Sequence, residues 1–217
     1  MRESTAVRPL RKPASRYHHG DLRRALLQEA VRTIARDGVD GLTLREVGSR
    51  LGVSRTALYR HFADKSALLA AVARDGFQRF SDDLRHAWQA HGESREGFEM
   101  MGKAYVRFAV SNPSHYRVMF GDYRSLCERE PALEAEAAAS FQVLIDAIVT
   151  LQQAGLVRKD DPKALAQFIW AIVHGIAMLA INGQLGPGTG RHLDDVVAFA
   201  LQRLRTGIDA PARARTR

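Results

Sequence analysis

The sequence predicts an all-α fold with about nine helices. Apolar residues recur at helical spacing along most of the chain, as in the run from Leu26 to Ile34. No segment shows a convincing alternation of apolar and polar residues, which would be typical of a strand. Pro13 and Pro113 bound a long stretch without proline, the residue that most strongly breaks helices. Helices are therefore favoured throughout.

Local start and stop signals define the first four helices. The first is predicted at 21–37, where Asp37-Gly38 ends it. The next three are predicted at 43–50, 54–61 and 64–90. Thr43 and Glu46 have the spacing of a capping box, in which the two side chains satisfy backbone amides reciprocally. Ser54 and Asp64 are N-cap candidates for the following two helices.

The same signals place five further helices in the second half of the chain. Asn112-Pro113 and Asp161-Pro162 each put a capping side chain before a proline at the first helical position. Gly155 ends the helix before the second of these pairs. The predicted ranges are 94–111, 113–120, 131–154, 162–183 and 192–206.

Composition restricts the class of protein. The chain has 217 residues, of which 46% are hydrophobic and 26% charged, so a folded globular protein is expected. Its single cysteine, Cys127, excludes an internal disulfide and any zinc site with two thiolates. The most apolar stretch, 168–181, is short for a membrane span and suits a buried helix. No secretory signal is recognisable, so we expect a cytoplasmic location.

The positive charge is concentrated at the N-terminal end. Residues 1–65 hold 14 Lys and Arg against 7 Asp and Glu, whereas residues 66–209 hold 15 against 17. A basic end joined to a nearly neutral remainder favours contact with a polyanion over simple solubility, although both readings remain open. Segments 1–19 and 208–217 are predicted to be basic arms.

Residues 43–62 have the pattern of a helix-turn-helix. Gly52 permits the tight turn, and Gly48 lets the second helix approach the first closely. The second helix carries hydrogen-bonding and basic side chains on its outer face, so it can enter the major groove of DNA. The alternative is that these are two ordinary helices of a bundle.

The run from Leu42 to Leu68, with the preceding helix and its Asp37-Gly38 exit, resembles the DNA-binding domain of the TetR family of bacterial transcriptional regulators. Gly48 stands where alanine is commoner in that family. The resemblance implies a DNA-binding domain at 20–80 and an effector-binding and dimerisation domain at 81–207, with the long helix joining them.

The resemblance also implies roles for side chains of the first domain. Thr43 and Arg45 would hold phosphates, Arg55 and Thr56 would read bases, and Tyr59, His61 and Lys65 would contact phosphates. Tyr59 and His61 could instead be packing residues. The full predicted DNA-binding set is Thr43, Arg45, Ser54, Arg55, Thr56, Tyr59, Arg60, His61 and Lys65.

In the second domain, the run Trp170-Ala171-Ile172-Val173-His174-Gly175 resembles the subgroup whose C-terminal domain is named for Trp-His-Gly. Residues 164–190 contain no Asp, Glu, Lys or Arg, so one side of this helix is expected to meet the chain's own core and the other a partner subunit or a cavity. His174 is more often a hydrogen-bonded core histidine than a ligand contact in such a place.

Aromatic and methionine side chains are dense in the middle helices, which is typical of a core and also of an apolar pocket. We expect a pocket between 94–111, 131–154 and 162–183 for a neutral or weakly acidic effector, because no Asp or Glu is expected on its inner faces. Tyr105 and His174 are its expected polar anchors. The full predicted pocket set is Met101, Tyr105, Phe108, Phe120, Phe141, Ile145, Trp170 and His174.

In the family, the last two helices pair across a dimer axis. The predicted interface residues are Ile172, Ile176, Leu179, Leu193, Val197, Ala200 and Leu204. The sequence therefore favours a homodimeric repressor of a palindromic operator, released by a small apolar effector, with no cofactor, metal or membrane partner. Alternatives are a DNA-binding dimer without effector and, with little support, an all-α enzyme, since the sequence has no phosphate loop, metal-spaced His/Glu pair or serine elbow.

Overall fold

The computed structural model describes residues 19–121, 126, 130–185 and 190–209, and this part of the chain is almost entirely helical. The predicted arms and Cys127 lie outside the described residues, except for a few positions at their inner edges. The helices follow the predicted order closely: α1 (His19–Gly41), α2 (Leu44–Arg50), α3 (Arg55–His61), α4 (Lys65–Ala90), α5 (Arg95–Ser111), α6 (Pro113–Phe120), α8 (Pro131–Gln153), α9 (Pro162–Ile181) and α10 (Gly190–Ile208).

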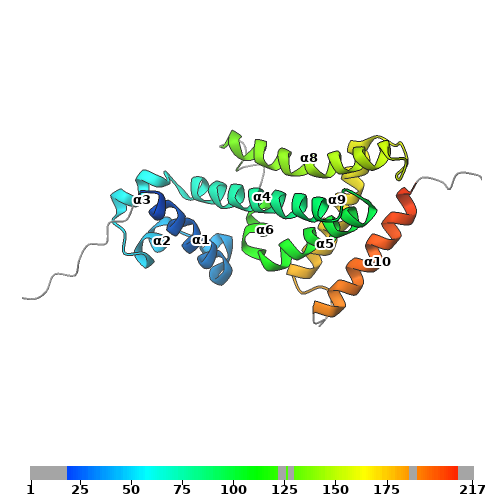
Figure 1. Cartoon of the computed structure of the whole chain (residues 1–217). Helices are drawn as coiled ribbons and strands as arrows, with labels where there is room; N and C mark the ends of the chain where they lie inside the picture. Colours follow the sequence, from blue (N-terminus) through cyan, green and yellow to red (C-terminus); the bar gives the residue numbers. More distant parts are fainter. Residues whose placement is uncertain (1–18, 122–125, 127–129, 186–189, 210–217) are drawn as a thin grey trace, which may run out of the picture.

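Helices α1, α2 and α3 form a small bundle at one end of the molecule (Figure 1). Gly38 has φ 76° and ψ 175°, so regular helix in α1 ends just before it, as the sequence indicated. The hydroxyl of Thr43 accepts a bond from Glu46 N at 3.2 Å, but the Glu46 carboxylate is bonded by Arg36 and Arg50. Among the described residues, only the hydroxyl half of the predicted capping box is therefore made.

Helix α4 runs from this bundle through the second domain (Figure 1) and packs against α5, α6 and α8. Its inward side, from Leu68 to Trp88, is apolar except for the buried Ser81. Helix α6 lies where the two domains meet, because it contacts α1 as well as α4. At the α4–α6 contact, Gly76 leaves no room for a side chain: a Cβ there would lie 2.6 Å from Met119 Sδ.

Of the two capping residues predicted in the second domain, Asp161 caps its helix and Asn112 does not. Asp161 Oδ2 accepts from Ala164 N at 2.8 Å, which caps α9 as predicted. Asn112 was expected to cap α6, but its side-chain amide donates to Phe108 O at 3.1 Å and so closes the end of α5 instead.

The end of α10 is tied to the segment after α8. Arg158 N donates to Ile208 O at 2.9 Å, and Arg95 at the start of α5 forms an ion pair with Asp209 at 2.9 Å. Three segments distant in sequence therefore meet at one end of the second domain.

Within the described residues, α9 is the one helix that is long and apolar enough to cross a membrane by length and composition. In this fold it packs against α5, α8 and α10. Its inward side is buried at Leu165, Ala166, Ile169, Val173 and Ala177. The helix is therefore a core helix with one apolar side left uncovered.

Candidate DNA interface, cavity and apolar face

The contact between α2 and α3 is fixed by a glycine and a buried leucine. A Cβ at Gly48 would lie 3.0 Å from Leu58 Cδ2, so the two helices approach as closely as the sequence indicated. Leu58 is 2% exposed and Phe62 3% exposed, which makes both core residues. Gly52 has φ 64°, a conformation that glycine adopts without strain, and it forms the turn between the helices.

The outer side of α3 is a row of exposed hydrogen-bonding groups. Arg55, Thr56, Tyr59 and Arg60 are exposed, while His61 is half-buried at the end of the helix. Ser54 Oγ accepts from Ala57 N at 3.2 Å, which leaves its hydroxyl proton free to donate. The predicted base-reading residues therefore share one accessible side of a short helix.

Arg45 and Lys65, both predicted to contact phosphates, differ in how exposed their side chains are. Arg45 is exposed on α2. Lys65 is half-buried, and its ammonium group donates to Asp40 O at 3.0 Å. Its ammonium group therefore lies against the last residues of α1 and has less reach than that of a fully extended lysine.

A cavity of about 510 Å³ lies in the second domain, among α4, α5, α8, α9 and α10. Its size is in the range of pockets that hold small molecules. The wall is mainly apolar and rich in aromatic rings. Of the predicted pocket residues, those that line it are Met101, Tyr105, Phe120, Phe141, Trp170 and His174.

Three expectations about the cavity are corrected by the structure. Phe108 is buried against the Phe80 ring at 5.2 Å between centroids, and neither Phe108 nor Ile145 lines the cavity. The expected absence of acidic side chains is also wrong, because Glu99 and Glu134 are part of the wall. In addition, residues of α4 and α10 line the cavity, whereas the sequence predicted a pocket between α5, α8 and α9.

Four polar side chains form a connected cluster at the cavity. Trp170 Nε1 donates to Tyr105 Oη at 3.0 Å. The Tyr105 and Tyr116 hydroxyls lie 3.0 Å apart, and His174 Nδ1 lies 3.1 Å from Tyr105 Oη and 2.7 Å from Tyr116 Oη. His174 is thus a hydrogen-bonded core histidine that also lines the cavity.

Burial sets the protonation of this cluster. Removal from water raises the pKa of both Tyr105 and Tyr116, so the two hydroxyls stay protonated at neutral pH. Desolvation lowers the pKa of His174, which favours the uncharged imidazole. The cluster therefore offers neutral hydrogen-bonding groups and no charge.

Helix α6 connects the cavity to the bundle of α1, α2 and α3. Phe120 lines the cavity, Tyr116 belongs to the polar cluster, and the helix contacts α1 on the other side. His115 is buried and lies 3.2 Å from Asp75 on α4; this bond lowers the pKa of Asp75. Because α6 packs against both helices, a displacement of α6 would also displace α4 and α1.

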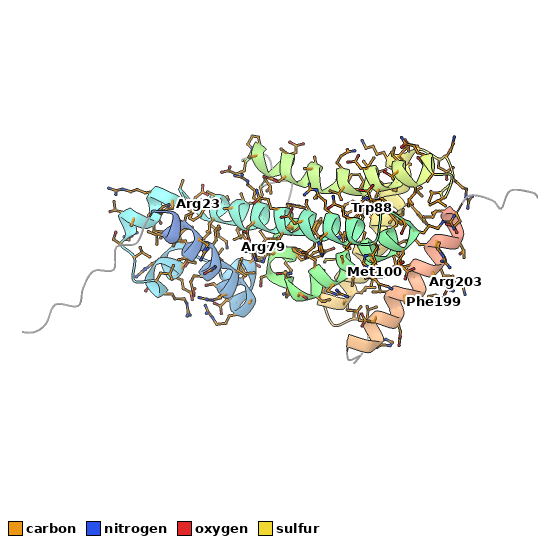
Figure 2. All side chains as sticks on the ribbon, viewed as in Figure 1. Arg23, Arg79, Trp88, Met100, Phe199 and Arg203 are labelled. Atoms are coloured by element: carbon orange, nitrogen blue, oxygen red, sulfur yellow. The ribbon has the colours of Figure 1, made fainter. Side chains whose placement is uncertain are left out.

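An uncovered apolar face runs over α9 and α10. Phe168 is 52% exposed, Leu179 42% and Phe199 60%, and at Gly175 a Cβ would meet nothing within 4 Å. Phe199 carries the guanidinium of Arg203 over its ring at 5.1 Å, on the side of α10 away from the rest of the chain (Figure 2).

The predicted interface residues divide between this face and the core. Leu179 is exposed, and Ile172, Ile176, Leu193 and Ala200 are half-buried. Val197 and Leu204 are 4% and 6% exposed and pack inward, and Leu204 lines the cavity. The prediction that Val197 and Leu204 lie in the dimer interface is therefore wrong, because both are core residues. When a helix has apolar residues on several sides, its sequence does not show which side packs against its own domain.

The structure adds residues that the sequence reasoning did not select. Tyr116 completes the polar cluster, Arg95 and Asp209 line the cavity, and Phe168 and Phe199 are the most exposed large apolar side chains of the described residues. Phe199 could have been found, because it shares one helical side with the polar His192 and Asp195.

Two family models match the chain. The model of bacterial regulatory proteins of the tetR family matches residues 26–72, and the model of the tetracyclin repressor-like C-terminal domain matches residues 98–204. Together they cover most of the chain. The second match contains the run from Trp170 to Gly175.

Two relatives are named as transcriptional regulators of the helix-turn-helix type. The transcriptional activator FasR of Mycolicibacterium smegmatis is 25% identical over 63% of this chain and 61% of its own length. The transcriptional repressor Rv1474c of Mycobacterium tuberculosis is 39% identical over 30% of this chain and 34% of its own. The chain thus spans less than two thirds of either relative.

Among solved structures, a Rhodococcus sp. RHA1 protein of unknown function is similar over nearly its whole length. The TM-score is 0.77 at 33% identity, covering 90% of this chain and 99% of that one.

Proposed function

Because the chain belongs to the TetR family of bacterial transcriptional regulators, we propose that it binds a palindromic operator as a homodimer and is released by a small apolar effector. The observation that carries the proposal is the pairing of two features in one chain: the exposed polar side of α3 and the cavity of about 510 Å³ beyond α4. In this proposal the operator-bound protein blocks transcription and its release restores transcription, so the protein acts as a repressor.

At the operator, α3 enters the major groove and α2 lies across the backbone. Arg55 and Thr56, at the start of α3, read base edges. Thr43, Arg45 and Ser54 contact phosphates, as do Tyr59, Arg60, His61 and Lys65 farther along the chain. The positive charge of residues 1–65 supports this orientation, since it brings the basic end of the protein to the DNA.

The effector acts by changing the spacing of the two recognition helices in the dimer. A molecule in the cavity touches Phe120 at the end of α6 and Phe77 and Phe80 on α4. Both helices reach the DNA-binding domain, so their displacement moves α3 in each copy. The effector releases DNA only when it binds the DNA-incompetent spacing more tightly than the competent one.

The DNA-binding part is tested by selecting genomic fragments on the purified protein and then measuring affinity for the best fragment and for random DNA. Arg55→Ala should weaken the specific complex by roughly 1–3 kcal/mol and relax the preference at one base step. Lys65→Ala should weaken both complexes alike. Arg107 is exposed on α5, remote from α3 in sequence, and Arg107→Ala is the matched control that should change neither.

Equal losses on specific and random DNA for Arg55→Ala would remove Arg55 from base reading. Selection of fragments without two-fold symmetry would contradict the homodimeric operator. A protein that selects an operator but is released by none of a broad set of apolar compounds would be a constitutive DNA-binding dimer.

A further inference from the structure

The position of the His174 ring proton decides which hydrogen bonds the polar cluster at the cavity can form. Two hydroxyls and one ring nitrogen, those of Tyr105, Tyr116 and His174, lie within hydrogen-bond distance of one another, and Trp170 adds one donor. A neutral imidazole carries its one proton on Nδ1 or on Nε2, and the other nitrogen accepts.

The Nε2–H form of His174 gives an acceptor to the indole proton and to both hydroxyl protons of the cluster. Trp170 Nε1 donates to Tyr105, Tyr105 donates to Tyr116, and Tyr116 donates to His174 Nδ1 across the shortest contact, 2.7 Å. With the proton on Nδ1, one tyrosine hydroxyl has no acceptor within the cluster. The first arrangement avoids an unmade bond in a buried place, which costs about 1–3 kcal/mol.

One donor is left at the end of this chain. His174 lines the cavity, and no described residue is hydrogen-bonded to its Nε2. The three preceding bonds run in one direction and polarise each other, which strengthens the final donor. Tyr116 and Tyr105 are 0% and 6% exposed, so this end of the site is the desolvated end.

The cationic groups of the described cavity wall, Arg95 and Arg205, lie at another end. Arg95 is ten residues before Tyr105 on α5, a distance of about 15 Å along the helix axis. Its guanidinium is bonded to Asp209 and Leu156 O, and Arg205 lies four residues before Asp209. Of the acidic wall residues, Glu99 forms an ion pair with Lys103 at 2.8 Å, and Glu134 is exposed near the start of α8. A negatively charged group of a ligand would therefore meet its cations at the Asp209 end of the wall, whereas the end at His174 suits an uncharged acceptor.

We propose that the effector is an apolar molecule that places an uncharged carbonyl oxygen against the Nε2–H of His174. The proposal rests on the effector site described above and specifies its ligand class. Within the expected class of neutral or weakly acidic ligands it selects a neutral group at this end of the cavity, because a carboxylate there would lose its hydration and meet no cation.

The first test compares two probes that differ in one atom. Binding of 2-acetylnaphthalene, which has a carbonyl, and of 2-isopropenylnaphthalene, its alkene analogue, is measured by calorimetry on the full-length protein. The ketone should bind roughly 2–10-fold more tightly, the range expected for one net hydrogen bond. His174→Phe should abolish this preference, whereas Phe141→Leu, in the apolar wall, should weaken both probes and keep their ratio.

The second test needs no substitution. Nitrogen-15 spectra of the histidine side chains in the wild-type protein should show His174 as the Nε2–H form, with a signal that shifts on addition of the ketone and much less with the alkene. An Nδ1–H form, or equal affinities for the two probes in the wild type, would overturn the proposal while leaving the effector site intact. Failure of both probes to bind would count against the apolar effector site as well.

Discussion

The substitution Phe168→Asp should separate the proposed dimer. Phe168 is 52% exposed on α9, in the uncovered face that also holds Leu179 and Phe199. Phenylalanine buries roughly 150–250 Å² when fully covered, so the open half corresponds to about 100 Å². At about 25 cal/mol per Å², covering it with a second copy contributes about 2.5 kcal/mol.

A two-fold interface contains this residue twice, so the contribution is about 5 kcal/mol per dimer. Each 1.4 kcal/mol is a factor of ten in affinity, and the dissociation constant should therefore rise by between three and four orders of magnitude. The measurement is sedimentation equilibrium over a wide concentration range, with circular dichroism to verify that the single chain keeps its helices.

Val110 offers a matched control, because it is an apolar residue 37% exposed on α5, outside the face. Val110→Asp should leave the dissociation constant unchanged. An unchanged dissociation constant for Phe168→Asp, or a wild-type protein that is monomeric at micromolar concentration, would refute the assignment of the face to a second copy. Loss of binding to the palindromic operator should accompany dissociation, since each half-site is then bound alone.

Three further predictions concern stability. Leu58→Ala should lower the free energy of unfolding by roughly 2–5 kcal/mol, because it empties the contact between α2 and α3; urea titration measures this, and a loss below 1 kcal/mol would contradict the packing. Gly97→Ala should also destabilise, by roughly 1–3 kcal/mol, because its Cβ would lie 2.8 Å from Trp88 O; a more stable variant would show that helix propensity outweighs the clash. Burial raises the pKa of Tyr105 and Tyr116, so their contribution to the free energy of unfolding is present below the unfolded pKa of 10.0 and is lost as the pH rises above it. The loss is at most about 1.4 kcal/mol per pH unit for each tyrosine. Tyr116→Phe should make this decline shallower in urea titrations above pH 10, and an unchanged slope would argue against the burial.

Signals that act over a few residues were readable from the sequence. Ser54 and Asp161 begin helices as expected, because a cap joins a side chain to a backbone amide three residues away. Regular helix ends at Gly38 because glycine adopts a positive φ without strain. The close approach of Gly48 to Leu58 follows from a turn of fixed length. The predicted bond from the Glu46 carboxylate back to the start of α2 is not formed. The carboxylate instead accepts from Arg36, ten residues before it in sequence.

The sequence by itself therefore determined the helices, their order and the helix-turn-helix, on which the residues expected to read bases are exposed. Tertiary structure alone decided which side of α9 and α10 faces inward, which placed Val197 and Leu204 in the core and left Phe168 and Phe199 uncovered. It also joined Tyr116 to His174, 58 residues apart. The physical reason is that apolar burial is not directional, so several sides of an apolar helix compete for the core until the neighbouring helices are in place.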